Sequence, residues 1–142
     1  MSDPADTAGT EGEAPPAAPL PALVQRRFDR LAHAGAFPAD ASGVIEGRAG
    51  NLELGTQVWF QWRVAGGAVA EARFRAFGCP YTLAVCDLIA SGLKGGRPPQ
   101  PWQGDPHSWA AALGVPPERL GRLLIVEDAL RDAYRRWPAP LG

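Results

Sequence analysis

Residues 56–77 decide the fold, and they read TQVWFQWRVAGGAVAEARFRAF. In the first half, apolar and polar side chains alternate, which is typical of a strand with one buried face. Gly66 and Gly67 follow, and glycine adopts the positive φ angles of a tight hairpin turn without strain. The returning half alternates again. Its apolar face comprises Ala70, Ala72, Phe74 and Ala76. The stretch therefore predicts two antiparallel strands, 56–64 and 69–77, that share one polar face.

Helical patterns lie on both sides of this hairpin. Apolar residues recur at helical spacing before it and after it. Pro80 and Pro106 each occupy a favourable first helical position, and Asp105 is a good cap for the second of these helices. The predicted helices are 21–34, 80–93, 107–113 and 116–136, and a short strand is predicted at 44–48. The pattern as a whole indicates an α+β domain.

Composition and charge limit the classes of function. The chain has 142 residues, which suits one domain, and no apolar run approaches the length of a membrane span. Residues 1–20 form an Ala/Pro-rich acidic segment that we expect to be a disordered tail, and 21–138 form the domain. No signal peptide is readable, so we expect a cytoplasmic protein with no membrane contact.

The acidic residues of the tail conceal a small positive charge on the domain. Removing the four negative charges of the tail from the net charge of −1 leaves the domain near +3. That charge is scattered, whereas a nucleic-acid interface requires a basic cluster. We therefore expect no nucleic-acid partner.

The two cysteines, Cys79 and Cys86, have different expected roles. Seven residues apart on one helix, their Cα atoms would be about 10 Å apart, too far for a disulfide. Cys79 precedes the predicted helix, where the helix dipole favours a thiolate, so it is a candidate nucleophile or metal ligand. The alternative is a small buried side chain, which is the reading we favour for Cys86.

Residues 74–79 read FRAFGC, and residues 93–96 read LKGG. These segments resemble the region around the second cysteine of the IscU and NifU N-terminal family of iron–sulfur cluster scaffolds. Other segments resemble this family in the right order. Further similar segments are Phe28-Asp29, Gly35-Ala36-Phe37, Leu83-Ala84, Leu88, Pro116-Pro117 and Glu127-Asp128-Ala129. The resemblance spans about residues 22–136. It implies a three-stranded antiparallel sheet with helices packed on one face, the fold also found in the SufE sulfur acceptors.

The resemblance also implies a site, from which this sequence departs. Family members bind a nascent [2Fe–2S] cluster through three cysteines, with an Asp and a His nearby, and only Cys79 matches one of these ligands. The other positions fall on Leu54, Thr56 and the pair Gly121-Arg122. Because such a cluster takes four protein ligands, one thiolate does not hold it alone. The implied cofactor is therefore a [2Fe–2S] cluster, iron or none.

A few other side chains are candidates for the same site. Arg122, if it faces Cys79, would lower the pKa of the thiol and stabilise the thiolate. Glu53 lies beside the missing ligand position and could supply an oxygen to a metal. His33 and His107 are expected to be surface or capping residues. Asp87 is expected to face solvent.

Three functions remain open from the sequence. The first is a non-enzymatic scaffold-like or accessory role in iron–sulfur cluster assembly, with a cysteine desulfurase and other assembly proteins as partners. The second is a SufE-like sulfur acceptor or thiol protein that uses Cys79. The third is an interaction module that has lost the cluster site. The oligomeric state stays open. No Ser/His/Asp set, carboxylate pair or phosphate-binding glycine loop suggests a hydrolase or transferase.

Overall fold

The computed structural model describes residues 20–51, 53 and 55–138. In chain order its elements are α2 (Ala22–Phe28), β1 (Val44–Asn51), β2 (Thr56–Ala65), β3 (Ala68–Phe77), α3 (Pro80–Leu93), α4 (Pro106–Leu113), the 3-10 turn η2 (Pro117–Arg119) and α5 (Leu120–Tyr134). Except for Leu20, the acidic tail predicted at 1–20 lies outside the described residues.

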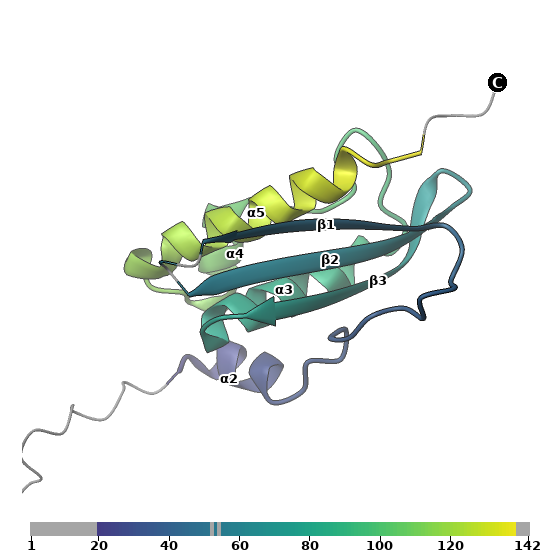
Figure 1. Cartoon of the computed structure of the whole chain (residues 1–142). Coiled ribbons are helices and arrows are strands. Elements are labelled where there is room, and N and C mark those ends of the chain that lie inside the picture. The colour runs from purple at the N-terminus through teal and green to yellow at the C-terminus, as the bar shows by residue number, and fades with distance from the viewer. Residues whose placement is uncertain (1–19, 52, 54, 139–142) are drawn as a thin grey trace, which may run out of the picture.

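The three strands form one antiparallel sheet in the order β1-β2-β3. Phe60 lies at its centre, opposite Gly47 on β1 and Phe74 on β3. Helices α3 and α5 cover one face of the sheet, and α2 packs against α3 (Figure 1). The predicted architecture, a three-stranded sheet with helices on one face, is confirmed.

Strand β1 continues beyond the predicted 44–48 and ends at Asn51. Gly47 does not interrupt the strand, because here the missing side chain lets helix α5 lie directly against the strand backbone. A Cβ added at Gly47 would overlap the backbone of Ala129 and Ala133. The glycine therefore permits strand and helix to pack with their backbones in contact.

The hairpin turn is confirmed, but one residue on the returning strand was assigned to the wrong face. Gly66 and Gly67 both have positive φ, 62° and 75°. A register shift follows, so that Val64 pairs with Val69 while Arg63 pairs with Glu71, and Ala70 is the extra residue of a bulge. Val69 is consequently 1% exposed and takes the core position predicted for Ala70.

The first helix ends at Phe28, six residues before the predicted end at residue 34. The segment after it pairs with the edge of the sheet instead of continuing the helix. The backbone N–H of Phe74 donates to the carbonyl of His33 (3.0 Å), and that of Gly35 donates to the carbonyl of Phe74 (2.8 Å). The last helix also differs, because the 3-10 turn η2 occupies residues that were predicted to be α-helical.

The core lies between the sheet and the helices. Its largest fully buried side chains include Trp62, Phe60, Phe74, Leu93, Leu123 and Leu130. Trp62 contacts Trp102 and Trp137 with ring centroids 6.3 and 6.2 Å apart. Among the described residues, no helix has the length and apolar character that crossing a bilayer requires.

Candidate functional site

Cys79 lies at the junction between β3 and α3. Its backbone is extended, with φ −82° and ψ 164°, and Pro80 begins the helix directly after it. The thiol is half-buried, whereas Cys86 on the same helix is fully buried. Burial, together with the charge of Asp87, raises the pKa of the Cys86 thiol. Of the two cysteines, Cys79 is therefore the one whose thiol can react.

The surroundings of Cys79 favour the thiolate. Partial burial raises the pKa of this thiol, but the Thr82 hydroxyl, 3.5 Å from Sγ, lowers it. The backbone N–H groups of Thr82 and Tyr81 lower the pKa further, although the Cys79 side chain makes no capping hydrogen bond to the helix. The positive charge of Arg119 lowers the pKa as well. The net pKa of Cys79 lies below its ordinary value.

The guanidinium that acts on Cys79 belongs to Arg119, a residue that the sequence reasoning missed. Its Cζ lies 5.8 Å from the centroid of the Tyr81 ring, which places the cation beside the first turn of α3. Arg122 is half-buried and is not among the charges that shift this pKa. A 3-10 turn has three residues per turn, so η2 changes the direction of the side chains that follow Pro116. The role predicted for Arg122 stays a prediction.

The turn between β1 and β2 lies at the same end of the sheet as Cys79. Gln57 pairs with Phe77, and a Cβ added at Gly78 would lie 3.6 Å from Oγ1 of the buried Thr56. Glu53 is exposed on this turn, and Leu54 lies outside the described residues. The fold thus gathers Thr56, Cys79 and Arg119 at one end of the sheet, while a ligand role for Glu53 stays a prediction.

The described residues do not supply a ligand set for a cluster. They contain no group of three or more His, Cys, Asp and Glu side chains placed to hold a metal ion. His107 is exposed on α4, and the backbone N–H of His33 donates to Asp87. Since a [2Fe–2S] cluster takes four protein ligands, the donor set in the described part of this chain does not fit one.

Asp87 does not face solvent, contrary to the prediction. It is 3% exposed because α2 packs across α3 at this position. Its carboxylate accepts hydrogen bonds from Arg27 (3.0 Å) and from the backbone of His33 (2.9 Å). The partner residues lie 54 and 60 positions earlier in the chain, so no local pattern indicated them.

Fold and site together define a small α+β domain that presents one activated cysteine where a strand meets a helix. The family described as NifU-like N terminal domain matches residues 22–140. The chain therefore belongs to the NifU-like N-terminal domain family.

Curated relatives agree with this assignment. The chain is 23% identical over 114 residues to the iron-sulfur cluster assembly protein IscU of Plasmodium falciparum, covering 80% of this chain and 70% of that protein. It is 24% identical over 116 residues to the iron-sulfur cluster assembly scaffold protein IscU of Haemophilus influenzae, covering 81% and 92%.

A solved structure from Fervidobacterium islandicum, a putative iron-sulfur cluster assembly scaffold protein for the SUF system, has the same fold. It superposes with a TM-score of 0.61 at 16% identity, covering 80% of this chain and 94% of that one. At this identity the likeness concerns the fold alone.

Proposed function

We propose that this protein acts in iron–sulfur cluster assembly as a scaffold-like or accessory protein whose reactive group is the Cys79 thiolate. The observation that carries the proposal is the half-buried Cys79 held at the start of α3 with a lowered pKa. Membership of the NifU-like family supports the process, and so do relatives named as cluster assembly proteins. A cysteine desulfurase, which supplies sulfur, is the partner that this role requires.

In this proposal an iron–sulfur species is cargo, and the chain supplies one ligand to it. A thiolate is the form of cysteine that ligates iron, and a lowered pKa increases its population at neutral pH. The remaining ligands would have to come from a second subunit or from a partner protein, since the described residues hold no further set. Cys79 would therefore bind at a boundary between chains.

Metal analysis of anaerobically isolated protein tests this role. We expect the wild type, supplied with iron and sulfide, to bind iron and to absorb visible light, and Cys79→Ser to lose both. Cys86→Ala is the matched control, because the Cys86 thiol is fully buried and should not contribute. A wild-type protein that stays colourless and iron-free, as Cys79→Ser does, contradicts the proposal.

A sulfur-acceptor role is the second candidate, favoured by the combination of an activated thiol with a missing ligand set. The Cys79 thiolate would attack the outer sulfur of a desulfurase persulfide. The new S–S bond forms on Cys79, the desulfurase S–S bond breaks, and the desulfurase cysteine leaves as its thiolate, with no net oxidation.

Intact-protein mass spectrometry after incubation with a desulfurase and cysteine distinguishes this second role. We expect a gain of one sulfur atom on the wild type and on Cys86→Ala, and none on Cys79→Ala. No gain on the wild type eliminates the acceptor role. A cellular function that survives Cys79→Ala would instead indicate an interaction module without thiol chemistry.

A further inference from the structure

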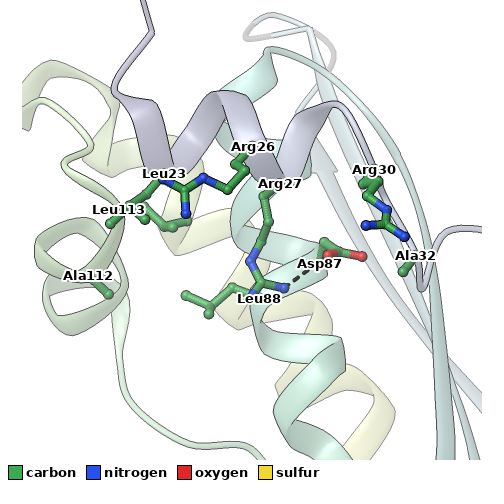
Figure 2. A pocket seen from close by; sticks show the side chains of 9 residues that line it. All are labelled: Leu23, Arg26, Arg27, Arg30, Ala32, Asp87, Leu88, Ala112 and Leu113. Atoms are coloured by element: carbon green, nitrogen blue, oxygen red, sulfur yellow. Dashed lines mark hydrogen bonds and ion pairs between the residues drawn. The ribbon is translucent and has the colours of Figure 1, made fainter.

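A pocket of about 550 Å³ lies between α2, α3 and α4, away from Cys79. Its apolar lining includes Leu23, Leu88 and Leu113, one from each of these helices. Three arginines, Arg26, Arg27 and Arg30, come from α2 and the turn after it (Figure 2). The pocket thus combines an apolar floor with a positively charged wall.

Among the described residues, two of the three arginines in this pocket have no anionic partner. Arg27 pairs with Asp87, as the dashed line in Figure 2 marks. Within residues 20–51, 53 and 55–138, the side chains of Arg26 and Arg30 make no ion pair and no hydrogen bond. By contrast, Arg73, Arg75, Arg131, Arg135 and Arg136 each pair with a carboxylate. The pocket wall therefore carries two positive charges that no carboxylate in the described part of the chain neutralises.

We propose that the acidic N-terminal segment of this chain, residues 3–13, docks on this pocket and places its carboxylates on Arg26 and Arg30. The segment contains four carboxylates and no Lys or Arg, so its charge complements that of the wall. Its acidic residues are Asp3, Asp6, Glu11 and Glu13. Alanines and prolines at positions 14–19 join it to α2 and provide small apolar groups for the floor around Leu23, which is 49% exposed.

The connection is long enough for this arrangement. Six residues separate Glu13 from Leu20, so a fully extended connection would span about 23 Å, whereas α2 rises only about 9 Å from Ala22 to Phe28 and Arg30 follows two residues later. The segment can therefore run back along α2 and reach both arginines. Tethering gives it an effective concentration on the order of millimolar, which lets weak exposed ion pairs hold it. An acidic segment of a partner protein would have to displace it.

Paramagnetic relaxation measured by NMR on the full chain tests the docking. A nitroxide attached at Thr10→Cys, in a Cys79→Ser background, labels the segment alone because Cys86 is fully buried. We expect the label to broaden the amide signals of Ala112 and Leu113, which lie far from it in sequence but line the pocket. The broadening should disappear in about 1 M NaCl, where the Debye length is about 3 Å.

Charge variants identify the contact. Arg26→Gln with Arg30→Gln should weaken docking by about tenfold, the effect of losing two exposed ion pairs. Lys94→Gln with Arg97→Gln changes the net charge equally outside the pocket lining and should leave the broadening intact. If the arginine variant fails to fold, replacing Asp3, Asp6, Glu11 and Glu13 with their amides removes the same contacts without altering the domain. The proposal is overturned if the wild type shows no broadening of Ala112 and Leu113. It is also overturned if the broadening is unchanged in the Arg26/Arg30 variant or in the variant with the four amides.

Discussion

Nη1 of Arg27 lies 3.0 Å from Oδ2 of Asp87, and this pair joins the first helix to the centre of α3. The Asp87 side chain is 4% exposed and that of Arg27 is 31% exposed, so the carboxylate is the more deeply buried partner. The other carboxylate oxygen accepts the backbone N–H of His33. One acidic group therefore fixes both α2 and the segment that leaves it.

Removing either partner should destabilise the fold, and removing the acid should cost more. We expect Arg27→Ala to lower the free energy of unfolding by about 2 kcal/mol, because it leaves a buried carboxylate without its cation. Asp87→Ala should cost about 3 kcal/mol, since it also removes the acceptor of the His33 N–H. Urea unfolding measures both values. Gln25→Ala, which loses an exposed bond on the same helix, is the control and should change little. Equal, small effects for all three variants would contradict this account.

The rate at which iodoacetamide alkylates Cys79, measured against pH, should report its lowered pKa. The thiolate is the nucleophile, so a lowered pKa moves the onset of labelling to lower pH. Thr82→Val and Arg119→Gln each remove a group that favours the thiolate, and each should move the onset to higher pH.

Arg122→Gln is the matched control for Arg119→Gln, because it removes the same charge three residues later. We expect it to leave the onset of labelling unchanged. A larger shift for Arg122→Gln than for Arg119→Gln would restore the role that the sequence predicted for Arg122.

Asp132 should make the stability depend on pH in the acid range. The backbone N–H of Arg48 lowers the pKa of Asp132; slight burial raises it, but Arg136 and Arg135 lower it further. Because the folded pKa is below the unfolded value of about 3.9, the carboxylate adds stability above that pH. This contribution is lost as pH falls through the folded pKa. Asp132→Asn should therefore be less stable than the wild type at pH near 7 and about equal to it in strong acid. Thermal unfolding of both proteins at each pH measures this difference. A difference that persists after protonation would rule out the carboxylate charge as its cause.

Gly47→Ala should be among the most damaging single-methyl changes in this protein. The added Cβ would overlap the backbone of Ala133, and backbone atoms of a packed helix cannot move aside locally. We expect a loss of about 3 kcal/mol in the free energy of unfolding. Gly92→Ala on α3 meets no atom within 4 Å and should be neutral or slightly stabilising. Chemical denaturation of the two variants compares them, and equal stabilities would show that α5 does not lie against β1 as closely as described.

The predictable parts of the fold were those that local sequence determines. The hairpin follows from alternation on both sides of Gly66-Gly67, and the start of α4 follows from Asp105, whose side chain accepts the N–H of Ser108. The early end of α2 was not predictable, because residues 33–35 are held by hydrogen bonds to β3, forty residues away. The bulge at Ala70 likewise depends on how two strands align.

In the candidate site too, the feature set by local sequence was predictable and the contacts with distant residues were not. Cys79 was identifiable because Pro80 places it directly before a helix. The residues around Cys79 were not identifiable, since Arg119 lies forty residues later in the chain, in a 3-10 turn that replaces the expected α-helix. Asp87 was assigned to solvent because its partner in the ion pair, Arg27, is sixty residues away.

The hydrogen bonds at the two outer strands limit how other proteins can bind. On β1 the N–H of Arg48 donates to Asp132 (2.9 Å), and on β3 both backbone groups of Phe74 are used by His33 and Gly35. At these two positions the outward main-chain groups already have partners inside the domain. An incoming β-segment that paired across Arg48 or Phe74 would therefore have to displace these contacts.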